Sequence, residues 1–95
     1  MKLSNSELKE VVLEVATEKY GTGLFRRRPL MLAVEAHIRQ GGAWSISDDI
    51  ISSSRGLKSE GLAKIDWAIS HLYEAGRLVN EGRDRWRVPQ SRSRA

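Results

Sequence analysis

The feature that most constrains the fold of this chain is an amphipathic run, Leu62 to Gly76, that leads into a short arginine-rich segment ending at Val88. Apolar side chains in the run recur at spacings of three and four, which places them on one face of a helix: Leu62, Ile65, Ile69, Leu72 and Tyr73. Gly76 suits the left-handed backbone position just past a helix end, and Gly82 supplies the glycine that a tight hairpin turn needs. The sequence therefore predicts a long helix followed by a two-stranded hairpin.

Strand alternation separates apolar from basic side chains in this hairpin. We expect Leu78, Trp86 and Val88 to face the helices, whereas Arg85 and Arg87 face solvent. An arginine-rich outer surface of this kind suits phosphate oxygens.

Two further helices are predicted before the long one. Ser4 and Glu7 have the spacing of a capping box, which indicates an N-terminal helix over residues 4–20 with an apolar stripe that faces either a core or a dimer partner. Pro29 suits the first turn of a second helix, over residues 30–40.

The segment between the second helix and the long one carries weaker signals. We expect Ala43 to Ile46 to form a short strand that places Trp44 in the core. We expect Trp86 to be a core residue in the same way, on a strand of the hairpin. A brief helix would follow from Asp48 to about Ser53, capped by Ser47, and the long helix would begin near Ser59.

The stretch Glu74-Ala75-Gly76-Arg77-Leu78-Val79, followed by Gly82-Arg83, resembles the end of the recognition helix and the wing of the winged helix-turn-helix superfamily. The resemblance runs from Pro29 to Val88. It implies an α+β, mostly α fold that binds DNA, with an additional N-terminal helix and a C-terminal β-hairpin wing. The same scaffold also serves as a protein-docking module.

The length of 95 residues fits one domain, which we place at residues 1–88, with the winged helix-turn-helix core over 29–88 and a disordered basic tail over 89–95. Cysteine is absent, and the two histidines, His37 and His71, lack other ligands at metal-binding spacing. No glycine-rich phosphate loop or nucleophile with a neighbouring base is present. We expect no enzyme activity, no cofactor and no metal, and a cytoplasmic location without a membrane partner.

The net charge of +4 is concentrated in the C-terminal third, where arginines gather on the hairpin. A recognition helix would add contacts to base edges and to phosphates, although Gly61, Leu62 and Ala63 offer little base readout. The triplet Arg26-Arg27-Arg28 is either a solvated loop or a second phosphate clamp. The expected nucleic-acid contacts are Arg55, Lys58, Ser59, Lys64, Trp67, Ser70, His71, Arg83, Arg85 and Arg87.

Trp67 projects away from the apolar face of the long helix, about 180° from its centre. An indole on that side needs a partner: the N-terminal helix or the wing folded over it, another protein, or DNA. Of these, we predict that the indole of Trp67 is buried under the N-terminal helix.

Together these patterns predict a protein that binds double-stranded DNA, a small transcriptional regulator that acts as a homodimer with the N-terminal helix near the interface. Two alternatives stay open. One is a protein–protein interaction module that docks a partner through Trp67, and the other is an RNA-binding protein.

Overall fold

The computed structural model of the protein describes residues 1–51 and 59–89. This part of the chain is mostly helical, with a small antiparallel hairpin, in agreement with the predicted α+β, mostly α class. The basic tail predicted over 89–95, apart from Pro89, and the end of the brief helix predicted to run to about Ser53 lie outside the described residues. The elements are α1 (Asn5–Tyr20), α2 (Arg27–Gln40), the short 3₁₀ helix η1 (Ile46–Asp49), α3 (Glu60–Glu74), β1 (Val79–Asn80) and β2 (Trp86–Arg87).

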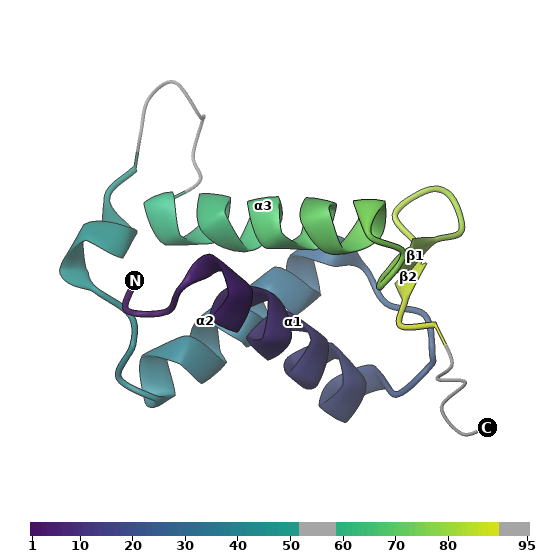
Figure 1. Ribbon diagram of the computed structural model, residues 1–95, viewed down its shortest axis with the longest axis horizontal. Coiled ribbons are helices and arrows are strands. Elements are labelled where there is room, and N and C mark those ends of the chain that lie inside the picture. Colours follow the sequence, from purple (N-terminus) through teal and green to yellow (C-terminus); the bar gives the residue numbers. More distant parts are fainter. Residues whose placement is uncertain (52–58, 90–95) are drawn as a thin grey trace.

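The core lies where α1 and α2 pack against one side of α3, with the hairpin closing one end (Figure 1). Each helix contributes one apolar face to it. The apolar stripe of α1 therefore faces the core of its own chain, which resolves the choice left open by the sequence. The buried apolar residues are Leu8, Val12, Val15, Ala16, Phe25, Leu30, Met31, Val34, Ile38, Ile65, Ala68, Ile69, Leu72, Leu78 and Trp86.

The predicted helix ends are confirmed where they depend on local capping. The capping box at α1 is formed, with the Glu7 amide donating to the Ser4 hydroxyl and the Ser4 amide to the Glu7 carboxylate. At the end of α3, Gly76 adopts a φ of 77°. The Arg77 amide then donates to the Leu72 carbonyl, which completes a Schellman motif.

The predicted start of α2 is wrong by three residues, because α2 begins at Arg27 and Pro29 lies within its first turn. The extension depends on a long-range contact. The backbone N–H of Arg27 donates to the carboxylate of Asp84, which comes from the hairpin. A cap supplied from 57 residues away leaves no mark in the local sequence.

The predicted strand at residues 43–46 is also wrong, and a different segment pairs with the hairpin. Phe25, between α1 and α2, forms an isolated antiparallel bridge with Trp86, with backbone hydrogen bonds in both directions. Residues 46–49 form η1 instead, which replaces the brief helix expected from Asp48. Trp44 is consequently half-buried in a loop, not held on a strand.

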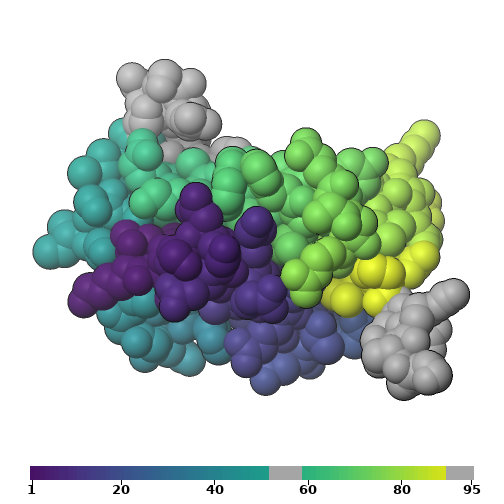
Figure 2. All heavy atoms as spheres, in the orientation of Figure 1, coloured from purple at the N-terminus to yellow at the C-terminus, as the bar shows by residue number. Residues whose placement is uncertain are grey.

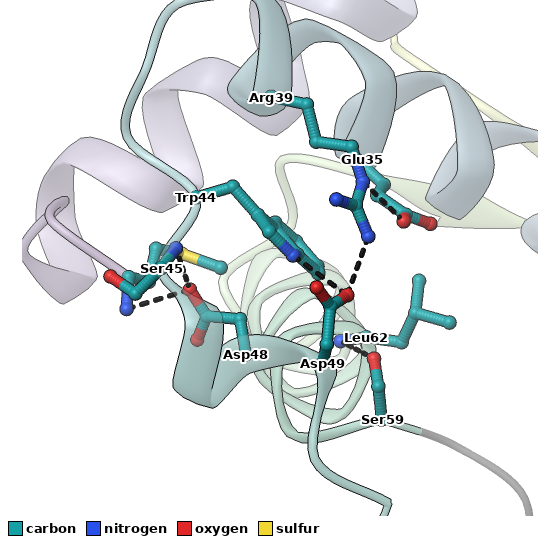
Figure 3. A network of polar contacts seen from close by, with 9 residues as sticks. Glu35, Arg39, Trp44, Ser45, Asp48, Asp49, Ser59 and Leu62 are labelled. Atoms are coloured by element: carbon teal, nitrogen blue, oxygen red, sulfur yellow. Dashed lines mark hydrogen bonds and ion pairs between the residues drawn. The ribbon is translucent and has the colours of Figure 1, made fainter.

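Trp44 is nevertheless fixed by its surroundings. Its indole N–H donates to Asp49 at 3.1 Å, and the guanidinium of Arg39 lies 4.7 Å from its ring centre (Figure 3). Arg39 also bonds Glu35 and Asp49, and the indole and guanidinium together lower the pKa of the Asp49 carboxyl. The other edge of the ring lies against Gly61 of α3, where a Cβ would fall 2.2 Å from the indole.

The predicted apolar face of α3 is confirmed at Ile65, Ile69 and Leu72, which are buried. Leu62 is half-buried. Tyr73 is 50% exposed, contrary to prediction, and its ring meets that of Trp86 edge to face. The buried face of α3 is therefore rotated away from Tyr73 relative to the predicted face. It is centred on Gly61, Ala68 and Leu72, because α3 packs on both α1 and α2.

Candidate nucleic-acid interface

Two groups of arginines from distant parts of the chain meet beside the hairpin. Phe25 pairs with Trp86, and the Arg27 amide reaches Asp84. Continuing this antiparallel register by one residue places Arg26 across from Arg85. Because Phe25 and Trp86 are both buried, the alternation of side chains along extended backbone directs Arg26 and Arg85 outward together.

Two nearby arginines, Arg27 and Arg87, form ion pairs with acidic side chains of the protein. Arg27 forms an ion pair with Asp66 at 2.6 Å, donates to the Ser70 hydroxyl at 2.9 Å and lies over the ring of Trp86. Arg87 forms an ion pair with Glu81 across the hairpin. Arg87, one of the predicted phosphate contacts, is therefore less available than Arg85.

Arg28 and Arg83 add exposed charge at the same end of the molecule. Arg83 lies at the tip of the hairpin, where Arg83 and Asp84 have φ values of 51° and 63° and form the turn after Gly82. Within residues 1–51 and 59–89, Arg26, Arg28, Arg83 and Arg85 have no acidic partner at ion-pair distance. We call these four residues the basic end; the hairpin that carries two of them forms one tip of the molecule (Figure 2).

Two of the predicted contacts on α3 have structural partners. The Ser59 hydroxyl accepts the backbone N–H of Leu62 at 3.2 Å and caps the helix. The Ser70 hydroxyl is half-buried and accepts the hydrogen bond from Arg27 described above. Both side chains therefore hold the fold together and have limited freedom to bind a ligand.

Lys64 is exposed, but it lies 3.9 Å from the carboxylate of Asp48, which is itself only 1% exposed. That carboxylate also forms an ion pair with the α-ammonium group of Met1 at 2.7 Å and accepts a hydrogen bond from the backbone N–H of Ser45 at 2.8 Å. Burial raises the pKa of the Asp48 carboxyl, but the hydrogen bonds and the nearby positive charges outweigh burial and hold the pKa below its usual range. Lys64 thus faces an ionised internal carboxylate.

Trp67 is 36% exposed, so its indole is not buried under the N-terminal helix, contrary to the prediction. Its ring packs against that of His71 at a centroid distance of 4.2 Å, and Lys9 of α1 lies 5.9 Å from it. A hollow of about 230 Å³ beside it is lined by Glu60, Ala63, Lys64 and Trp67.

The remaining predicted contacts, Arg55 and Lys58, lie outside the described residues. The role of the triplet at 26–28 is not settled by the sequence. The bridge that anchors the triplet joins Phe25 to Trp86, which lies far along the chain, so no local signal could have settled its role.

In the described part of the chain, no group of three potential metal ligands is present and no helix is long and apolar enough to span a membrane. Comparison of the chain with protein-family models, with curated proteins and with solved structures gives no match. The chemistry of the basic end is therefore the main guide to function.

Proposed function

We propose that this protein binds double-stranded DNA through the phosphate backbone, with the basic end as the contact surface. The observation that carries the proposal is the antiparallel bridge between Phe25 and Trp86, whose register, continued by one residue, sets Arg26 across from Arg85. Like charges placed opposite each other on paired backbone segments destabilise a fold. An anion between the two guanidinium groups removes this repulsion, and arginine matches the geometry of phosphate oxygens.

The winged helix-turn-helix resemblance supports the same reading. The hairpin after α3 would be the wing, with Phe25 in the position of a third strand beside β2. The outer side of α3 is poor in base-reading side chains: Glu60 and Glu74 carry the wrong charge for phosphate, and Ser70 is engaged by Arg27. We therefore propose binding with little sequence preference. A role in transcription regulation stays a prediction of the sequence.

The test uses Arg26→Glu, a variant for which stability and binding should change in opposite directions. The introduced carboxylate would face Arg85 and replace a repulsive pair by an attractive one, so the melting temperature should stay the same or rise. Duplex DNA binding should weaken, and the slope of log affinity against log salt should fall by about two, since Arg26 is lost and Arg85 becomes paired.

Lys2→Glu is the matched control because it makes the same change of net charge at an exposed side chain far from the hairpin. The backbone amide of Lys2 donates to the Ala43 carbonyl, a bond that the substitution keeps. The salt slope of this variant should equal that of the parent protein. Equal slopes for the parent and Arg26→Glu would contradict the proposal, as would an equal loss of slope in the two variants.

A further inference from the structure

The outer side of α3 carries a stripe whose spacing is symmetrical. Glu60, Lys64, Trp67 and His71 follow one another at intervals of four, three and four residues. At 100° per residue all four fall within an arc of about 60°, outside the buried face of α3, and Lys9 of α1 borders this arc at Trp67. A stripe with this spacing matches a second copy of itself that runs in the opposite direction.

The chemistry of the stripe is complementary in that antiparallel register. Glu60 of each chain faces His71 of the other, where a carboxylate meets an imidazole N–H. Lys64 of each chain faces Trp67 of the other, which suits a cation–π contact. A parallel arrangement would instead set Glu60 against Glu60 and Lys64 against Lys64.

The hollow beside Trp67 fits the same register. It is lined by Glu60, Ala63, Lys64 and Trp67, so its centre lies between positions 63 and 64. In the antiparallel arrangement Trp67 of the second copy lies over position 64, directly above the hollow. The volume of about 230 Å³ offers a place for the indole that is left partly exposed in the single chain.

We propose that the stripe Glu60–Lys64–Trp67–His71 is the interface of an antiparallel homodimer, in which each Trp67 enters the hollow of the other chain. The contact is isologous, as expected for a two-fold dimer. Lys9, which lies near Trp67 in its own chain, stands at the edge of this interface. The inference does not rest on DNA binding.

The test is a charge swap followed by sedimentation equilibrium from micromolar to millimolar protein. Glu60→Lys and His71→Glu should each shift the protein toward the monomer, because they set like charges or unmatched groups against each other. The double variant should recover the dimer, because the introduced lysine of each chain then faces the introduced carboxylate of the other. Trp67→Ala should remain folded and become monomeric, while Glu14→Lys, an exposed change on α1, should leave the dimer intact.

Melting temperatures measured on the same samples separate loss of dimer from loss of fold. A parent protein that is monomeric at every concentration would overturn the proposal. So would a double variant that is no more dimeric than the single ones. A third overturning result is a loss of duplex DNA binding in the stripe variants with no change of mass, because α3 would then face DNA.

Discussion

At the scale of single residues, Gly61 shows how a position can be constrained by a partner that the local sequence does not reveal. A glycine inside a helix normally costs about 1 kcal/mol relative to alanine. Here Gly61→Ala should destabilise the protein, by roughly 1–3 kcal/mol, because the new Cβ would overlap the indole of Trp44. Denaturant unfolding measures the change.

Trp44→Ala supplies the control for this prediction. In the Trp44→Ala background the overlap is gone, so adding Gly61→Ala should now stabilise α3, and the sign of the effect should reverse. If Gly61→Ala stabilised the parent protein as well, the close packing of Trp44 on α3 would be wrong.

Among the elements, Asp84 of the hairpin joins the start of α2 to Trp86 of β2. Asp84 accepts hydrogen bonds from the Arg27 amide and from the indole N–H of Trp86, at 3.1 and 2.9 Å. Asp84→Ala should cost roughly 1–3 kcal/mol, because two donors lose their acceptor. Asp84→Asn keeps an acceptor oxygen and tolerates the positive φ, so its cost should be smaller. Equal losses for the two variants in thermal unfolding would contradict this role.

The sequence could predict the ends of a helix where they depend on residues close together in the chain, and not where they depend on distant residues. The ends of α1 and α3 are set by neighbours in sequence, Ser4 with Glu7 and Gly76 with the preceding turn, and both were predicted. The start of α2 depends on Asp84, and the third extended segment is Phe25. Neither is visible to a reading of local periodicity.

In the candidate site, too, some features could be predicted from the local sequence and others depend on how the elements pack. The hairpin arginines could be located because strand alternation exposes Arg85, while Gly82 marks the turn that carries Arg83. The pairing of Arg87 with Glu81, and of Arg27 with Asp66, could not be foreseen, since each depends on how elements pack. These two ion pairs leave the basic end as a surface to which an anion can bind.

At the scale of the whole molecule, the two proposals place different tasks on different surfaces. The basic end would hold DNA, while the outer side of α3 would hold a second copy. In the antiparallel dimer the C-terminal ends of the two α3 helices would lie roughly 25 Å apart, from a rise of about 1.5 Å per residue. The hairpins extend further, toward the roughly 34 Å repeat that separates two half-sites on duplex DNA.

An NMR titration of isotope-labelled protein with a short DNA duplex tests most directly whether the basic end binds DNA. We predict that the largest shifts of backbone amides and arginine side chains fall at Arg26, Arg28, Arg83 and Arg85, and that they diminish as salt is raised. An unaffected basic end, with the largest shifts on the outer side of α3 at Lys64, would contradict DNA binding by the basic end.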